Sequence, residues 1–470
     1  MSGGADHEPA AGTAGGGRDL DRPLDLDLLG IGFGPSNLGL AIAAGEHVAQ
    51  VARTGSGARG APLRVGFVER QPRFGWHRGM LLDDATMQVS FLKDLVTQRN
   101  PSSDFSFVSY LHERGRLTDF INHKILFPLR IEFHDYLEWA AARVEHLVTY
   151  DQEVVDVVPV VVDGVVLAFD VVARDQAGRS TVRRARDVVV APGLAPCLPA
   201  GVTLGPRVWH NLDILSRVET VPADPAPRRF AVVGAGQSAA EVVDYLHKRF
   251  PTAEVCSIFA RWGYTPADDT PYANRIFDPG AVDTYFAADD AVKRMLLDYH
   301  RGTNYSVVDA DLINDLYRRE YQERVQGQPR LRMLNASQVV ATDPGPDGVG
   351  LEVEFLPTGE RSNLHVDALV YATGYAPTDP ARLLGQAGEL VARRPDGELA
   401  VERDYRVTLD AAAEAAVYVQ GGTEHTHGIS STLLSNIAIR AGEIVASVAA
   451  RRAAPSSRSV PHRVEATIGA

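Results

Sequence analysis

The stretch Gly32-Phe33-Gly34-Pro35-Ser36-Asn37 joins a short apolar run, residues 24–32, to a segment with helical spacing that starts at Asn37. A glycine-rich turn between a strand and a helix is typical of a dinucleotide-binding unit, because the glycines allow a tight turn and close approach of the pyrophosphate, and the helix N-terminus offers free N–H groups. Asn37 departs from the usual glycine or alanine. The next predicted strand, 63–69, ends in Glu69, an acid placed to bond a ribose hydroxyl.

A second fingerprint, Gly234-Ala235-Gly236-Gln237-Ser238-Ala239, lies between a predicted strand at 229–234 and a predicted helix at 238–250. No acid ends the following strand, and Arg261 comes shortly after it. Arginine pairs with a 2′-phosphate that an acid would repel; the alternative is that Arg261 is a solvated surface residue. Two such units indicate a flavoprotein reduced by a nicotinamide. We assign FAD to the first, with Gly32, Gly34, Pro35, Asn37 and Glu69, and NADPH to the second, with Gly234, Gly236, Gln237, Ser238 and Arg261.

Two predicted strands end in near-identical turns, at 187–193 and at 367–375, and the second contains Thr373 and Gly374, which we expect at one of the cofactors. The expected fold class is α/β, with two Rossmann-like dinucleotide-binding domains and a smaller, mostly helical substrate-binding insertion. We divide the chain into disordered tails at 1–23 and 451–470, an FAD-binding domain at 24–220 and 362–450, an NADPH-binding domain at 221–264 and 331–361, and the helical insertion at 265–330.

Composition narrows the function classes. The 470 residues include 47 basic and 60 acidic ones, for a net charge of −13, which argues against a nucleic-acid partner. The two cysteines, Cys197 and Cys256, are too few for a disulfide framework and fit a reducing, cytoplasmic compartment. No run is long and apolar enough for a transmembrane helix, and the N-terminus does not read as a signal peptide. His425 and His427 lack further ligands at metal spacing, so we expect no metal.

Residues 74–111 are the most distinctive part of the chain, and here it resembles the microbial N-hydroxylating flavin monooxygenases that act on ornithine or lysine in siderophore synthesis. The resemblance covers about residues 25–450. Besides both fingerprints, it rests on motifs that occur in the family's order: Phe74-Gly75-Trp76-His77, Met87-Gln88-Val89-Ser90-Phe91-Leu92-Lys93, Pro271-Tyr272-Ala273-Asn274, Asn304-Tyr305-Ser306-Val307-Val308, Ala372-Thr373-Gly374-Tyr375, His427-Gly428-Ile429-Ser430 and Leu433-Leu434-Ser435.

The resemblance implies roles for residues that have plainer explanations one by one. Lys93, a lysine among apolar neighbours, would anchor the substrate carboxylate, but it could also be a surface lysine. The other implied substrate contacts, which by themselves could be turn, cap or core residues, are Asn274, Asn304, Gln88, Leu434 and Ser435. Gln88 and Asn304 are also the expected catalytic residues. The implied flavin contacts are Trp76, His77, Met87 and Gln88, and His77 is not assigned as a base.

The implied reaction converts L-ornithine, NADPH and O₂ to N5-hydroxy-L-ornithine, with FAD reduced by NADPH before it meets O₂. The amine must be uncharged, although an alkylammonium titrates near about 10.4 in water, and a low-dielectric pocket of neutral asparagines would lower that value. L-Lysine or another amine is the alternative substrate, and a non-catalytic flavin redox sensor is the alternative of another class. A disulfide reductase would need a CxxC pair, which is absent. Relatives are often tetramers, so a homo-oligomer is expected.

Overall fold

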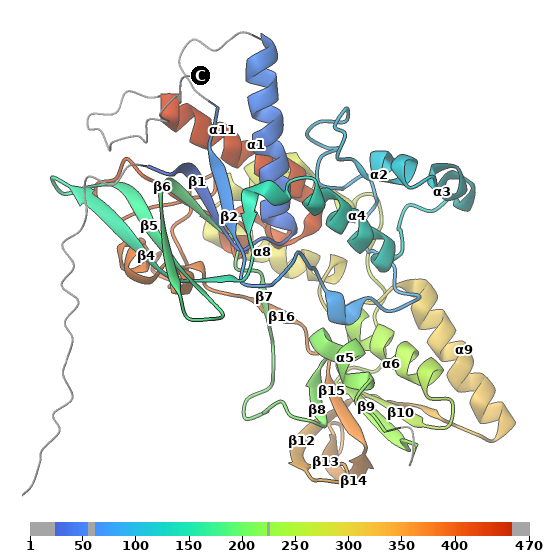
Figure 1. Ribbon diagram of the computed structural model, residues 1–470. Coiled ribbons are helices and arrows are strands. Elements are labelled where there is room, and N and C mark those ends of the chain that lie inside the picture. Colours follow the sequence, from blue (N-terminus) through green and yellow to red (C-terminus); the bar gives the residue numbers. More distant parts are fainter. Residues whose placement is uncertain (1–23, 55–61, 223–225, 454–470) are drawn as a thin grey trace, which may run out of the picture.

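The computed structural model describes residues 24–54, 62–222 and 226–453, which form two lobes (Figure 1). The predicted tail at 1–23 lies outside the described residues, and so does most of the tail predicted at 451–470. Helix α11 (Ile437–Ala453) runs past the predicted boundary at 450. None of the helices within the described ranges is long and apolar enough to cross a membrane.

The first lobe is built on a mixed sheet whose centre is the apolar run before the first fingerprint. Strand β1 (Leu26–Ile31) pairs in parallel with β2 (Val65–Val68) and β6 (Ser180–Val190). The sheet order is β17-β18-β6-β1-β2-β3, and β4 and β5 extend it through β6. The remaining strands are β3 (Val148–Thr149), β4 (Gln152–Val162), β5 (Val165–Asp175), β17 (Arg406–Val407) and β18 (Val417–Val419).

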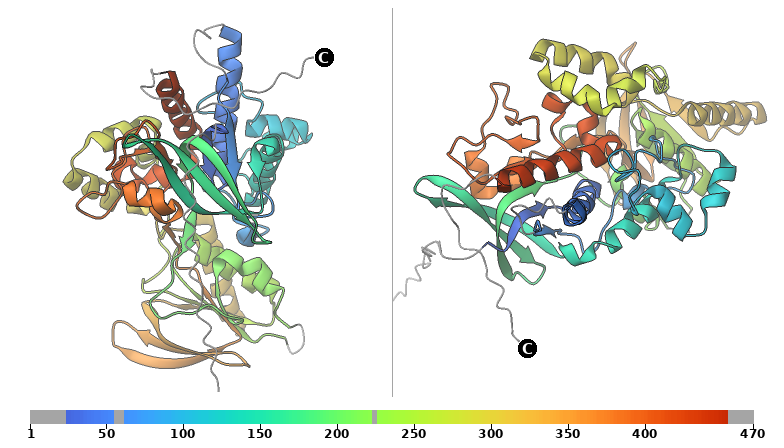
Figure 2. Two further views of the ribbon diagram at one scale, coloured as in Figure 1. Left: turned by 60° about the vertical axis from the view of Figure 1, so that its left-hand side comes forward. Right: turned by 90° about the horizontal axis from the view of Figure 1, so that it is seen from above.

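Helices cover this sheet because their apolar residues recur on one side. Helix α1 (Pro35–Thr54) lies beside α11, as the view from above shows (Figure 2). Both helices share a hydrophobic core with α4 (Arg130–Ala142). Many aromatic rings lie in this core, packed around Phe107. Two short helices, α2 (Phe107–Glu113) and α3 (Leu117–His123), complete this side of the lobe.

The second lobe contains a five-stranded parallel sheet in the order β11-β10-β9-β15-β8. Helices α6 (Gln237–Arg249) and α9 (Ala310–Gln326) pack together on one face, and a three-stranded antiparallel sheet covers the other. The parallel strands are β8 (Val208–His210), β9 (Arg229–Val233), β10 (Glu254–Ile258), β11 (Leu331–Leu334) and β15 (Ala368–Tyr371), and the covering strands are β12 (Ser337–Pro344), β13 (Val349–Phe355) and β14 (Glu360–Val366). Together the lobes confirm the predicted α/β class with two Rossmann-like units.

The edges of the second sheet do not coincide with the boundaries drawn from the sequence. Strands β8 and β15 lie outside 221–361 but pair within this sheet. Helix α9, which we placed in the insertion, packs on α6 and leads into β11. The rest of the predicted insertion, 265–330, includes α7 (Pro279–Ala287) and α8 (Asp290–His300). Strand β8 has only three residues, too few to show an alternation of apolar and polar side chains. Its place in the sheet is therefore seen only from its pairing with β15.

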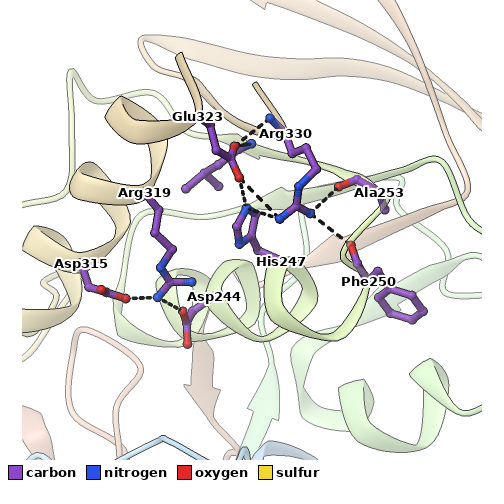
Figure 3. A network of polar contacts seen from close by, with 9 residues as sticks. Asp244, His247, Phe250, Ala253, Asp315, Arg319, Glu323 and Arg330 are labelled. Carbon is purple, nitrogen blue, oxygen red and sulfur yellow. Dashed lines mark hydrogen bonds and ion pairs between the residues drawn. The ribbon is translucent and has the colours of Figure 1, made fainter. Parts of the chain in front are cut away.

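A polar network fastens α9 to α6 (Figure 3). Glu323 accepts hydrogen bonds from the backbone N–H groups of Arg330 and Leu331, both at 2.7 Å, and its other oxygen lies 2.7 Å from His247 Nε2. The Arg330 guanidinium donates to the carbonyls of Phe250 and Ala253. One turn earlier, Arg319 pairs with Asp244 on α6 and with Asp315 on α9.

Two short strands join the lobes. Strand β7 (Leu194–Pro196) follows the turn after β6, strand β16 (Tyr375–Pro377) follows the matching turn after β15, and the two pair antiparallel. The turns are also equivalent in their packing. The Ala191 carbonyl lies behind Gly32 of the first fingerprint, and the Ala372 carbonyl lies behind Gly234 of the second. The similar turns in the sequence therefore reflect two copies of one arrangement.

Candidate functional site

The first fingerprint forms an open cradle at the start of α1. Gly32 has φ +84°, and a Cβ there would lie 2.6 Å from the Ala191 carbonyl oxygen, so only glycine fits without strain. At Gly34, by contrast, no atom of the described chain lies within 4 Å of a Cβ position. Helix α1 begins at Pro35, which has no N–H to leave unpaired. The open space lies at a helix N-terminus, where a pyrophosphate is stabilised.

Glu69 lies beside this cradle, as expected of a ribose-binding acid. Its side chain is 6% exposed. One carboxylate oxygen accepts from the Phe33 N–H at 2.6 Å and the other from the Gln71 N–H at 2.8 Å. These two bonds orient the carboxylate and leave it further lone pairs for a ligand hydroxyl.

Asn37 braces the turn from behind. It is fully buried, its Nδ2 donates to the Gly32 carbonyl at 2.6 Å, and its Oδ1 accepts from Gln420 Nε2 at 2.8 Å. We therefore interpret this departure from the general fingerprint as a residue that shapes the cradle. Gln420 also meets Arg440, whose buried guanidinium donates to Ser36 Oγ at 3.2 Å. Sequence reasoning missed Gln420 and Arg440, because nothing in the local pattern links them to a turn almost 400 residues earlier.

The second fingerprint has the same strained geometry. Gly234 has φ +145°, and a Cβ there would overlap the Ala372 carbonyl. At Gly236 a Cβ would lie 3.4 Å from the Cα of Ser306. Gln237 is engaged within the protein, since its Oε1 accepts from the Asp309 N–H at 2.7 Å and its Nε2 donates to Glu241 at 3.0 Å. Ser238 follows in the first turn of α6.

Arg261 lies on an exposed part of this lobe, next to the second fingerprint. Its Nη1 donates to the Ser306 carbonyl at 2.9 Å, and Ser306 also approaches Gly236. Thr373 and Gly374 lie differently from the other predicted cofactor residues. Thr373 Oγ1 donates to the Cys197 carbonyl at 2.5 Å, and the Gly374 carbonyl accepts from the Cys197 N–H at 3.0 Å. These two residues thus hold the strands that join the lobes.

Lys93 lies against the short helix that carries Asn274, although 181 positions separate the two residues in the chain. Lys93 is half-buried, and its Nζ lies 5.6 Å from the centre of the Phe277 ring. Phe277 ends the short 3₁₀ helix η4 (Ala273–Phe277) that carries Asn274. Burial lowers the pKa of Lys93, and the nearby Asp278 offsets only part of this shift. Asn274 Nδ2 donates to the Asp269 carbonyl at 2.8 Å, which holds the turn in place.

Asn304 reaches the same region through its neighbour. Tyr305 donates from its hydroxyl to Glu424 Oε2 at 2.6 Å, in helix α10 (Glu424–His427). The 3₁₀ helix η8 (Ile429–Thr432) contacts both η4 and the 3₁₀ helix η9 (Leu434–Asn436). The structure therefore gathers the segments that carry Asn274, Asn304, Leu434 and Ser435.

Several buried polar atoms in this region have no hydrogen-bond partner among the described residues. A buried polar group without a partner is costly, so a cluster of them indicates a surface that meets a polar ligand. Ser435 was predicted here, and the others were not. Their carriers are at most 5% exposed, and the atoms are Thr423 Oγ1, Ser431 Oγ, Ser435 Oγ, Asn436 Oδ1 and Asn436 Nδ2. These orphaned groups fit a polar cofactor edge or substrate.

The residues expected at the flavin ring lie along one segment of the first lobe. The Trp76 and His77 rings meet edge to face at 4.8 Å, and Met87 is 4% exposed in the core of that lobe. Burial, with Arg130 nearby, lowers the pKa of His77 to about 4, so its ring is neutral at neutral pH. Gln88 is exposed, with its Nε2 3.5 Å from Thr86 Oγ1.

The histidines near 427 have structural partners. His427 stacks on Tyr405 at 4.1 Å and bonds with Thr426 and with the Arg403 carbonyl. Within the described ranges, no group of three or more histidine, cysteine, aspartate or glutamate side chains could hold a metal ion.

Two dinucleotide cradles joined by paired strands, with orphaned polar groups nearby, define a two-dinucleotide flavoprotein. The L-lysine 6-monooxygenase/L-ornithine 5-monooxygenase family matches residues 25–377, and the chain belongs to this family. It is 42% identical to an L-ornithine N(5)-monooxygenase of Burkholderia cepacia, over 87% of this chain and 91% of the relative.

Solved structures agree with this assignment. An ornithine N-hydroxylase of Kutzneria sp. 744, solved with reduced FAD, NADP⁺ and L-ornithine, is 46% identical with a TM-score of 0.85, over 92% of this chain and 100% of the other. An L-lysine 6-monooxygenase of Pseudomonas syringae is 32% identical with a TM-score of 0.77, over 91% of this chain and 99% of the other.

Proposed function

We propose that this protein is an FAD- and NADPH-dependent monooxygenase that converts L-ornithine, NADPH and O₂ to N5-hydroxy-L-ornithine. The observation that carries the substrate is Lys93, a half-buried cation beside the turn that carries Asn274. The higher identity to the ornithine enzyme than to the lysine enzyme supports ornithine.

The two cradles divide the cofactors. Gly32, Gly34 and Pro35 would hold the FAD pyrophosphate and Glu69 its ribose, while Gly234, Gly236, Ser238 and Arg261 would hold NADPH. Trp76 and Met87 would pack against the flavin ring. FAD, when bound, supplies the electrons that reduce O₂, having received them from NADPH. The protein itself holds the substrate, orients it and excludes water.

Substrate recognition needs opposite environments at the two ends of ornithine. The Lys93 ammonium would pair with the carboxylate, and the burial that lowers the pKa of Lys93 makes such an anion partner favourable. The N5 amine must keep its lone pair free for the oxygen atom. Amide and hydroxyl groups, as on Asn274, Asn304 and Ser435, can orient that amine without a negative charge that would stabilise its protonated form.

The test is turnover by purified, FAD-loaded protein with NADPH and air, with hydroxylamine product and hydrogen peroxide measured together. Ornithine, lysine, putrescine and aspartate are compared. We expect coupled N-hydroxylation with ornithine alone. Hydroxylation of lysine in preference would move the substrate assignment, and oxidation of NADPH to peroxide alone with every amine would overturn it. Absence of NADPH oxidation with all four would point to a flavin-binding redox sensor.

We infer further that the protein is a cytoplasmic homo-oligomer, with a tetramer as the expected state. Helix α9 supports an assembly because it exposes large side chains at helical spacing, with Tyr317, Tyr321 and Val325 each more than 60% exposed. Both cysteines are free thiols, which suits a reducing compartment. Light scattering of purified protein should give four times the 50.8 kDa mass of one chain, and a mass of one chain would contradict this assembly.

A further inference from the structure

Residues 78–86, here called the strap, leave the first lobe and bury three apolar side chains in the second. Phe74 before the strap and Met87 after it lie in the core of the first lobe. Between them, Met80, Leu82 and Ala85 are 2%, 3% and 7% exposed and belong to the core around α6. Figure 1 shows this blue segment next to α5 (Ile214–Val218), at the lower end of the blue chain that descends from the first lobe.

Both ends of the strap are anchored. A Cβ on Gly79 would overlap the Leu212 carbonyl of the second lobe, so the backbone is in close contact there. At the start of α4, the backbone N–H of Arg130 donates to the Ala85 carbonyl at 2.8 Å. The guanidinium of Arg130 also donates to the carbonyl of Met80, near the start of the strap, at 3.0 Å. It donates to the carbonyl of Thr86, the last residue of the strap, at 3.3 Å.

The same guanidinium pairs with the second fingerprint helix. Arg130 Nη1 lies 2.8 Å from Glu241 Oε2 and Nη2 lies 2.7 Å from Glu241 Oε1, a bidentate pair with side chains 12% and 5% exposed. Glu241 Oε1 also accepts from Gln237 of the fingerprint itself. The bonds therefore run without a gap from the second fingerprint to Thr86, two residues before Gln88.

We propose that Arg130 and Glu241 are positioning residues that couple NADP⁺ binding at the second fingerprint to ornithine binding beside Gln88. This inference rests on the proposed function. A buried bidentate ion pair cannot stretch cheaply, because separating it leaves two uncompensated charges in the interior. A shift of α6 on cofactor binding must therefore move the strap, and the strap continues directly into the segment expected to meet flavin and substrate.

The test is a binding cycle on FAD-loaded protein by titration calorimetry, with NADP⁺ titrated with and without ornithine and the reverse. In the wild type each ligand should lower the dissociation constant of the other by at least about fivefold. Glu241→Gln, which keeps the shape and removes the charge, should bring this factor near one and raise the NADP⁺ dissociation constant at least about fivefold. The peroxide fraction during turnover should rise.

Glu323→Gln is the matched control, because Glu323 bonds to His247 and to the backbone of Arg330 and Leu331 on the same lobe, none of which belongs to the strap. It should leave the coupling factor within about twofold of wild type. The double variant Arg130→Met/Glu241→Met separates folding from coupling, since an apolar pair can restore stability while the charge link stays absent. We expect its melting temperature to recover and its coupling to stay lost.

Equal coupling in wild type, Glu241→Gln and Glu323→Gln would overturn the proposal, as would a wild type with no coupling at all. Failure of the proposed function looks different, because the wild type would then neither bind nor hydroxylate ornithine. In that case the NADP⁺ dissociation constants still decide whether the pair positions the fingerprint: an increase in Glu241→Gln but not in Glu323→Gln supports it, and equal values exclude it.

Discussion

Lys93 combines two demands on one side chain. Its ammonium lies over the Phe277 ring, 5.6 Å from the ring centre, and the nearby Asp278 carboxylate favours its charged form. An exposed lysine would bind a carboxylate weakly, because water competes for both charges. A fully buried one would lose its charge. The intermediate position suits an anchor that is charged and still gains from an anionic ligand.

Lys93→Met should therefore raise the KM for ornithine by about 10–100-fold, the loss of a charge-assisted hydrogen bond. FAD content and the basal oxidation of NADPH should stay close to wild type, since Lys93 contacts neither predicted cradle. Putrescine, which has no carboxylate, serves as the control substrate in steady-state kinetics. An equal effect on putrescine would show that Lys93 supports the fold of the pocket and does not recognise the carboxylate.

The two glycines of the first fingerprint should fail for different reasons when each is replaced by alanine. Gly32→Ala forces a side chain into positive φ and against the Ala191 carbonyl, so it should destabilise the protein even without FAD. Gly34→Ala meets open space, so the FAD-free protein should melt as wild type while FAD binding is lost. Melting curves of FAD-free protein, with FAD titrations, check both. Normal FAD affinity in Gly34→Ala would contradict the assigned cradle.

The α6–α9 network should stabilise the second lobe through Glu323, which accepts two backbone hydrogen bonds and lies 2.7 Å from His247 Nε2. Glu323→Gln should lower the free energy of unfolding by about 1–3 kcal/mol, because one acceptor position becomes a donor facing donors. Urea unfolding and faster amide exchange in α9 measure this. Arg318→Ala removes an exposed pair with Asp315 and should change stability by less than about 0.5 kcal/mol.

Stability of the whole molecule should fall in acid because it buries neutral histidines. Burial lowers the pKa of His77 and of His427 to about 4, from an ordinary 6.5. The unfolded chain therefore takes up protons first, so this stability is complete above pH 6.5 and is lost as the pH falls toward 4. The differences correspond to about 3 kcal/mol per histidine. Buried Asp187, with its pKa raised to about 6, contributes in the opposite direction, since its share is lost as the pH rises through 6.

His427→Gln should reduce this acid dependence by about 3 kcal/mol between pH 7 and pH 4, whatever it does to stability at neutral pH. The measurement is the difference in unfolding free energy between the two pH values, by urea denaturation of wild type and variant. An identical pH dependence in both proteins would mean that His427 titrates normally in the folded chain.

Local chemistry was enough to predict both dinucleotide units. A glycine that must adopt positive φ, an apolar run before it and a helical period after it act within about 20 residues, so Gly32, Gly234 and their flanking strands could be recognised one by one. The family and the segments of the polar pocket followed from short motifs. The individual roles of Lys93, Gln88, Asn274 and Asn304 remain predictions.

Contacts between distant parts of the chain could not be predicted in this way. The bracing of Asn37 by Gln420, the orphaned Asn436, the pairing of β8 and β15 with β9, and the passage of the strap into the second lobe all join segments far apart in sequence. No local period or turn preference records such pairings, because they arise only when segments distant in the sequence pack against one another. Turn sterics and side-chain spacing are properties of neighbouring residues, so the sequence alone reveals them. The link from Gln237 through Glu241 and Arg130 to the strap forms only when the tertiary structure brings these distant segments into contact.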